Sequence, residues 1–321
     1  MNVLLFIAPL IVTLNATPLL ELTLFTDRTQ YWLGDYAQVF GYLYYNGSKV
    51  TDGIVSLEID EQALPQNETV IFRTFTTGTP PTTQSITILS VTLTNEIGTP
   101  RSSIKRGNNA YFTTTVKNND IANSININLT LTALDSASGI AGSTMQGFDL
   151  AANGTGTLTL PLYIQDKAAT GNATIYANAF TNLPRDKGKA LALEKSAKFT
   201  ITDTVQTPPS SGIFIPPEPG EFATAFKVPV FQFGKSTIYN FTVYTASTYK
   251  GETVTAKKLI RFRVPDLNLD NTVNVQDLIV VAGQIGWTGP PGSIAQDLNS
   301  DGKVNILDLM IVARVIGWTK T

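Results

Sequence analysis

The chain has 321 residues, 43% of them hydrophobic, which is enough for two or three domains with substantial cores. Its formal net charge is −2 and it has no long basic run, which excludes the electrostatic footprint of a nucleic-acid-binding protein. It has neither Cys nor His, which removes thiol nucleophiles, Ser–His pairs and His-ligated zinc or iron sites. Carboxylate pairs and lysines remain available, but acidic residues are sparse outside the C-terminal loops and no cleft-forming α/β pattern accompanies them. We therefore expect a protein that is not an enzyme.

An apolar run near the N-terminus, residues 2–14, is too short to span a bilayer and has the length of a signal-peptide core. We therefore predict a signal-peptide-like segment over residues 1–17 and no transmembrane helix. No Lys or Arg precedes the run and the cleavage site after it is poor, so a buried first strand is the alternative.

From residue 20 to residue 264 apolar residues alternate with polar ones. The alternation is clear at residues 20–24, 55–59, 125–131, 158–162 and 239–243. This pattern is typical of strands with one buried face, and turn signals such as Asn46-Gly47 and Asn153-Gly154 separate them. We expect an Ig-like β-sandwich architecture.

Two Pro- and Thr-rich breaks, residues 76–84 and 202–219, divide this β region. Between them residues 85–203 carry some seven strand signals, enough for a complete sandwich. The flanks, residues 18–80 and 212–264, carry four or five strands and three strands, so each alone would leave a sheet face uncovered. We therefore predict that the middle unit is inserted into a loop of one discontinuous outer sandwich. Three units in series are the alternative.

Two copies of a 12-residue pattern follow, 31 residues apart, at residues 266–277 and 297–308. Position 7 of each offers a backbone carbonyl and position 6 has Asn271 or Gly302, residue types that tolerate positive φ, as in a calcium-binding EF-hand loop. A polar turn is the alternative for one copy, but a duplication in register is hard to obtain by chance. The predicted metal-ligating residues are Asp266, Asn268, Asp270, Thr272, Asn274 and Asp277 for one ion and Asp297, Asn299, Asp301, Lys303, Asn305 and Asp308 for the other.

Each loop is followed by an apolar stripe at helical spacing and then by a Gly-Trp pair. The two stripes are Leu278, Val281, Ala282 and Ile285, and Leu309, Val312, Ala313 and Ile316. Neither loop is preceded by a helical pattern, so the predicted order is loop then helix, twice.

These loops and helices make about 55 C-terminal positions resemble a dockerin domain, the calcium-dependent module that docks onto cohesin domains on scaffolds and cell surfaces. The resemblance implies a small all-α module over residues 265–319 with two Ca²⁺ ions. Residues 85–203 resemble adhesion-type modules of archaeal and bacterial surface proteins, and the flanks resemble macroglobulin-type Ig-like domains. The predicted fold class is thus mainly β, with two Ig-like β-sandwich domains, one inserted in the other, followed by a small all-α dockerin-like calcium module.

In the best-known dockerins, loop positions 10 and 11 carry small hydroxyl residues that recognise the cohesin partner. Here these positions carry Val275, Gln276, Ile306 and Leu307, so the predicted partner is a cohesin-like domain or another surface protein domain. Exposed apolar residues that cluster usually mark a contact surface. The alternative is that they pack against the neighbouring sandwich or the Trp287 and Trp318 rings.

Three features favour a secreted or cell-surface location. The calcium loops would be filled at the millimolar calcium found outside cells. The absence of Cys fits a secreted prokaryotic protein without disulfides. Six Asn-x-Ser/Thr sequons add weak support, because a chain rich in Asn, Ser and Thr produces several by chance. They begin at Asn46, Asn67, Asn128, Asn153, Asn172 and Asn240.

Two functions follow as expectations. The first is a non-catalytic secreted or surface protein whose β modules serve display or adhesion while the calcium loops mediate docking. The second is an accessory or carbohydrate-binding subunit of an extracellular polysaccharide-degrading system. Tyr42, Tyr44 and Tyr45 could form its aromatic platform, although aromatic residues that fill a half-buried sheet give the same pattern.

Overall fold

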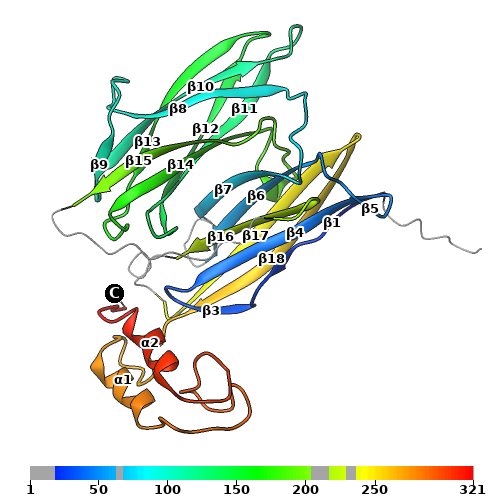
Figure 1. Ribbon diagram of the computed structural model, residues 1–321. Coiled ribbons are helices and arrows are strands. Elements are labelled where there is room, and N and C mark those ends of the chain that lie inside the picture. Colours follow the sequence, from blue (N-terminus) through cyan, green and yellow to red (C-terminus); the bar gives the residue numbers. More distant parts are fainter. Residues whose placement is uncertain (1–18, 63–67, 204–216, 229–235, 321) are drawn as a thin grey trace, which may run out of the picture.

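The computed structural model describes residues 19–62, 68–203, 217–228 and 236–320, and it is mainly β, as the alternating pattern predicted. Figure 1 shows three parts that follow one another in space. We call them the middle body (residues 86–202), the outer body (residues 20–76 and 221–263) and the C-terminal segment (residues 265–320). The predicted signal-peptide-like segment, residues 1–17, and the sequon at Asn67 lie outside the described residues.

The outer body consists of ten strands in two sheets that face each other. They are β1 (Leu20–Leu22), β2 (Phe25–Thr26), β3 (Gln30–Trp32), β4 (Tyr36–Tyr45), β5 (Ser48–Lys49), β6 (Ile54–Glu61), β7 (Glu68–Thr76), β16 (Glu221–Lys227), β17 (Ile238–Tyr249) and β18 (Glu252–Arg263). One sheet has the order β1-β4-β16 with β2 and β5 attached to β4, and the other has the order β3-β18-β17-β6-β7. Because β4 pairs with β16 and β6 pairs with β17, each sheet contains strands from both sides of the middle body.

The middle body holds the remaining eight strands. They are β8 (Ile86–Thr94), β9 (Ser103–Lys105), β10 (Asn109–Asn118), β11 (Ile125–Leu134), β12 (Ile140–Leu150), β13 (Thr155–Tyr163), β14 (Gly171–Phe180) and β15 (Lys195–Thr202). They form the sheets β13-β10-β8 and β12-β11-β14-β15-β9, which bury an apolar core of their own with the Phe112 and Phe199 rings in edge contact at 5.3 Å. Whether this body is a domain inserted in the other stays a prediction.

The two bodies are joined by partly buried polar contacts as well as by the chain. Arg73 on β7 makes a two-point ion pair with Glu194, with Nε–Oε2 at 2.8 Å and Nη2–Oε1 at 2.9 Å. Arg185, in the short 3₁₀ turn η1 (Pro184–Asp186), reaches Asp60 on β6 at 2.9 Å. An arginine fork paired through two hydrogen bonds with a carboxylate fixes orientation as well as distance, so the bodies meet in a defined geometry.

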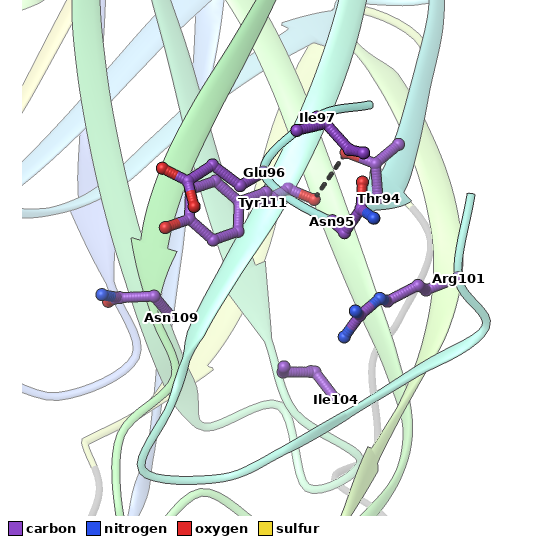
Figure 2. A pocket seen from close by; sticks show the side chains of 8 residues that line it. All are labelled: Thr94, Asn95, Glu96, Ile97, Arg101, Ile104, Asn109 and Tyr111. Carbon is purple, nitrogen blue, oxygen red and sulfur yellow. Dashed lines mark hydrogen bonds between the residues drawn. The ribbon is translucent and has the colours of Figure 1, made fainter. Parts of the chain in front are cut away.

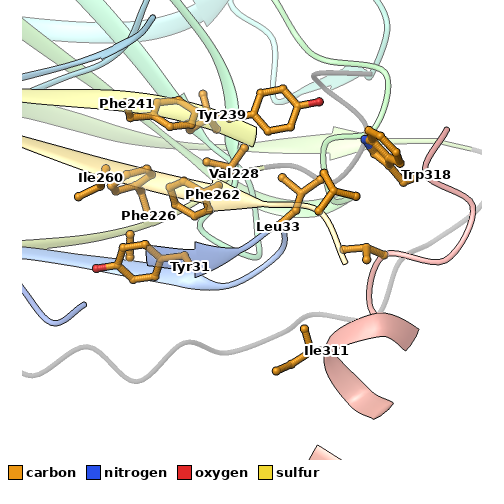
Figure 3. Close-up of a cluster of buried hydrophobic side chains, with 14 of the residues drawn as sticks. Tyr31, Leu33, Phe226, Val228, Tyr239, Phe241, Ile260, Phe262, Ile311 and Trp318 are labelled. Atoms are coloured by element: carbon orange, nitrogen blue, oxygen red, sulfur yellow. The ribbon is translucent and has the colours of Figure 1, made fainter. Parts of the chain in front are cut away.

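The C-terminal segment corrects the predicted fold class. It contains only two eight-residue helices, α1 (Val275–Ala282) and α2 (Ile306–Ala313), between long loops, and no distinct all-α dockerin-like module is present in the described residues. Its buried side chains share one apolar cluster with the outer body, where Trp318 and Ile311 join Tyr31, Leu33 and Phe262 (Figure 3). The prediction of a mainly β chain is confirmed, and the sheets are curled, which the sequence analysis did not predict.

The reason for this difference is the small size of the helices. Helices of two turns are marginal in water and gain their stability from packing rather than from propensity. The predicted stripes were longer than the helices, because α1 ends at Ala282 and α2 at Ala313, before Ile285 and Ile316. The second repeat therefore completes its core against the outer body.

Candidate metal centre

The first loop is folded by its own first and last carboxylates. Asp266 lies just beyond β18; its Oδ1 accepts a hydrogen bond from Asp270 N at 3.2 Å, and its Oδ2 accepts one from Asn271 N at 3.0 Å. Asp277 Oδ1 accepts from Leu267 N at 2.7 Å. The two ends of the 12-residue stretch are thereby brought together around buried carboxylates.

The second loop repeats this geometry residue for residue. Asp297 accepts from Asp301 N at 3.1 Å and from Gly302 N at 3.1 Å. Asp308 Oδ1 accepts from Leu298 N at 2.8 Å, the counterpart of the Asp277 contact. The sequence duplication is thus a structural duplication.

The turn of each loop requires left-handed backbone at two positions. Position 6 has φ 68° at Asn271 and 82° at Gly302, the residue types that tolerate it. Position 4 is left-handed as well, at Leu269 (φ 61°) and Ser300 (φ 55°), which the sequence did not reveal because neither residue type favours that region.

Loop positions 9 and 12 also start the helices. Asn274 is the N-cap of α1; its side chain accepts from Gln276 N at 2.7 Å, and Asp277 Oδ2 accepts from Asn274 N at 2.9 Å. Asn305 and Asp308 form the same capping box at α2. Two of the predicted ligands in each loop therefore set where the helix begins.

The electrostatics of the first loop bring like charges together. Burial raises the pKa of Asp266, hydrogen bonding from Asn271 N lowers it, and the neighbouring charges of Asp277 and Asp270 raise it further. Hydrogen bonds from Thr272 and Asn268 lower the pKa of Asp270. Carboxylates close enough to perturb one another are the kind of group that a divalent cation stabilises.

The donor chemistry of both loops fits calcium, although the carboxylates are not gathered around one point. Within the described residues no group of three or more His, Cys, Asp and Glu side chains is arranged to hold a metal ion. Three of the six predicted ligands in each loop are other groups, namely the two Asn side chains and the backbone carbonyl of Thr272 or Lys303, and calcium accepts amide and carbonyl oxygens of this type. The residues that would hold the two ions are those predicted from the sequence.

The predicted partner-binding residues lie at the starts of α1 and α2. Val275, Ile306 and Leu307 are 62%, 64% and 51% exposed, and Gln276 is exposed too. Sequence reasoning missed Ile279 and Met310, which are 63% and 45% exposed and occupy equivalent places in the two repeats. The sequence signal that was missed is an apolar residue in both copies outside the predicted stripe, of which only Val281 and Val312 are buried while Ile285 and Ile316 are exposed.

An apolar groove of about 370 Å³ lies between the two helices, and no polar side chain lines it. It is lined by Leu278, Ile279, Ala282, Ile306, Leu309, Met310 and Ala313. We call this groove, together with the exposed Val275 and Leu307 in the first turns of the same helices, the helix-pair face. Exposed apolar side chains gathered in this way are typical of an interaction site.

A second cavity of about 370 Å³ lies at one end of the middle body (Figure 2). Glu96 is the sole carboxylate among its lining residues, and the other polar groups come from Thr94, Asn95, Arg101, Asn109 and Tyr111. Hydrolysis by a carboxylate pair requires two such groups on either side of the scissile bond. This cavity lacks that arrangement.

Comparison with known proteins does not assign the chain to a family. No family model matches the chain, and a search of curated proteins finds no match. The C-terminal domain of Wzt is similar over 39% of this chain and 78% of its own, with 9% identity and a TM-score of 0.32. The Pseudomonas fluorescens alkylpurine DNA glycosylase AlkC is similar over 38% of this chain and 31% of its own, with 14% identity and a TM-score of 0.28.

A Bacteroides uniformis β-glucuronidase is similar over 53% of this chain and 26% of its own, with 10% identity and a TM-score of 0.28. The chain thus spans about a third or less of the length of the glycosylase and the glucuronidase. Likenesses of this size carry no argument about fold or function. Within the described residues, no helix is both long and apolar enough to cross a membrane.

Proposed function

We propose that this chain is a non-catalytic, secreted or cell-surface docking protein. Its two C-terminal loops bind two Ca²⁺ ions, and the helix-pair face binds an apolar patch on a folded protein domain, of the cohesin kind or of another surface protein. The β bodies serve display or adhesion. The observation that carries the proposal is that the helix-pair face stands on two helices whose first residues are capped by the predicted calcium ligands Asn274, Asp277, Asn305 and Asp308.

Calcium binding is connected to docking through the hydrogen bonds that cap the two helices. Asp277 and Asp308 each use both carboxylate oxygens to hold backbone N–H groups of the loop and of the helix start. A cation bound by the remaining lone pairs of these carboxylates would fix the loops and, through the capping boxes, the first turn of each helix. The partner-binding side chains at positions 10 and 11 lie in that first turn.

The chemistry of the face points to an apolar protein surface as its occupant. The groove exposes no polar lining, and the acidic residues of the first helical turns, Asp277 and Asp308, are fully buried. A polar small molecule would find few hydrogen-bonding groups there, whereas the core of a protein–protein interface is apolar and depleted in charge.

The test is capture of a purified cohesin-like domain, with calcium and with excess chelator. Ile306→Asp combined with Leu307→Asp should abolish capture in calcium while leaving the melting temperature of the chain nearly unchanged. A matched control is Ile97→Asp combined with Ile121→Asp, two strongly exposed residues of the middle body, which should leave capture intact. Capture that survives in the folded Ile306/Leu307 variant removes this face from the proposal.

One observation supports polysaccharide binding as a second candidate. Tyr42 and Tyr44 lie partly exposed on the same side of β4, with ring centroids 6.2 Å apart, and Lys49 Nζ lies 4.6 Å from the Tyr42 ring centroid. The third predicted platform residue, Tyr45, instead packs against Tyr249 at 5.5 Å and the apolar cluster beneath. Retention of the chain on insoluble polysaccharide, lost in Tyr42→Ala with Tyr44→Ala, would support this candidate, and equal retention of both proteins would remove it.

A further inference from the structure

The two calcium loops have nearly the same ligands but different surroundings. Both repeats contribute buried valines to the cluster shared with the outer body, Val273 and Val281 from the first repeat and Val304 and Val312 from the second, but the second repeat buries more of its side chains. Among residues 31 positions apart, Trp318 is 1% exposed whereas Trp287 is only partly buried, and Ile311 is buried whereas Val280 is partly buried.

Two contacts tie the second repeat to the outer body. Trp32, at the end of β3, donates its indole N–H to the backbone carbonyl of Leu298 at 2.7 Å. Leu298 is position 2 of the second loop, and its own N–H donates to Asp308, the closing carboxylate of that loop. The outer body therefore holds the peptide unit that joins Leu298 to the predicted ligand Asn299.

The second contact is an ion pair just beyond α2. Arg314 Nη1 lies 3.2 Å from Asp35 Oδ1, and Asp35 Oδ2 also accepts from Trp32 N at 3.2 Å. One carboxylate thus joins the end of the second helix to the residue that holds the second loop. The counterpart of Arg314 in the first repeat is Gly283, which has no side chain to form such a contact.

The backbone of the second loop is also easier to hold in shape. Its left-handed positions carry Ser300 and Gly302, whereas the first loop places Leu269, 78% exposed, and Asn271 there. A branched apolar residue in the left-handed region is costly, and glycine is not. Asp297 accepts an extra N–H donor from Gly292 at 2.8 Å, outside its own loop.

We propose that the two calcium sites are unequal: the second is a preorganised, high-affinity structural site that the outer body holds through Trp32, and the first is the weaker site whose occupancy follows the external calcium concentration. This inference rests on the proposed calcium function. A loop that is already fixed loses less conformational entropy when it binds its ion, which raises its affinity. Trp32 is then a positioning residue for the second site, and docking is governed by the first.

The test is calorimetric titration of the calcium-stripped full chain with calcium. We expect two steps whose Kd values differ by about tenfold or more, the difference that site rigidity produces between calcium loops. Asp270→Ala and Asp301→Ala form a matched pair, because both replace the exposed position-5 carboxylate and leave the capping boxes intact. Asp270→Ala should remove the weaker step and Asp301→Ala the tighter one.

Trp32→Phe keeps an aromatic ring but removes the N–H donor and part of the ring surface, and Trp287→Phe, which makes the same replacement in the first repeat, is its control. Trp32→Phe should weaken the tighter step alone, by about fivefold, as the loss of one hydrogen bond predicts, and Trp287→Phe should leave that step unchanged. Two equal steps in the parent chain, or a Trp32→Phe variant that alters neither step or both equally, overturn the inequality while leaving calcium binding in place. Absence of any calcium heat overturns the proposed function itself.

Discussion

The first and second C-terminal repeats differ mainly in what surrounds them. The ligand positions, the capping boxes and the carboxylate-to-backbone bonds coincide over 31 residues. Val315 is fully buried, whereas its counterpart Gln284 is exposed, and Arg314 binds Asp35 where the first repeat has Gly283. A short motif thus determines the local turn and helix start, and a few residues outside the motif determine which copy is buried against another part of the chain.

The largest expected difference between the repeats lies in their tryptophans. Trp318→Ala should lower the free energy of unfolding by about 3–5 kcal/mol, because the ring is 1% exposed within the cluster shared with the outer body. Trp287→Ala should cost clearly less, since its ring is only partly buried. Denaturant unfolding of the full chain, followed by circular dichroism, measures both. Equal losses would contradict the unequal burial of the repeats.

An exchange of residues between the repeats sharpens the comparison. Val315→Gln places an amide at a fully buried site and should destabilise the chain by about 2 kcal/mol, the cost of burying an amide without a partner. Gln284→Val changes an exposed position and should stay within about 0.5 kcal/mol of the parent. Thermal unfolding of both variants gives the result, and a change of several kcal/mol in Gln284→Val would contradict the exposure of Gln284.

The smallest expected effect belongs to the ion pair between the second repeat and the outer body. Arg314→Ala should lower the free energy of unfolding by only about 0.5 kcal/mol, because the Arg314 side chain is 50% exposed and solvent screens the pair. Raising the salt concentration should shrink the difference from the parent chain further. A loss of several kcal/mol that persists in high salt would mean that the contact is far less accessible to water than its exposure indicates.

The sequence predicted what is local in the C-terminal segment. The loop-then-helix order and the left-handed turns at Asn271 and Gly302 follow from residue types that favour them. The left-handed Leu269 and Ser300 could not be predicted, because the hydrogen bonds of the loop, and not residue preference, impose that conformation.

The local sequence pattern could not predict how the C-terminal segment packs. A stripe such as Leu309, Val312, Ala313 and Ile316 shows that one face of a helix is apolar but not which partner covers it. The prediction of a self-contained all-α module assumed that the helices cover each other, whereas the second repeat packs on the outer body. The sequence did contain a signal of this difference, because the first repeat has Gln284 at the position where the second repeat has Val315. In the β region, the alternation of apolar and polar residues was enough to predict the strands. The pairing of β4 with β16 depends instead on contacts between residues distant in sequence.

The central claim is that calcium in the two loops controls the helices that carry the helix-pair face. Hydrogen–deuterium exchange of the full chain, with millimolar calcium and with excess chelator, tests it most directly. Calcium should slow amide exchange strongly in α1 and α2 and leave β10 of the middle body unchanged. The same exchange rates in α1 and α2 under both conditions would contradict the account.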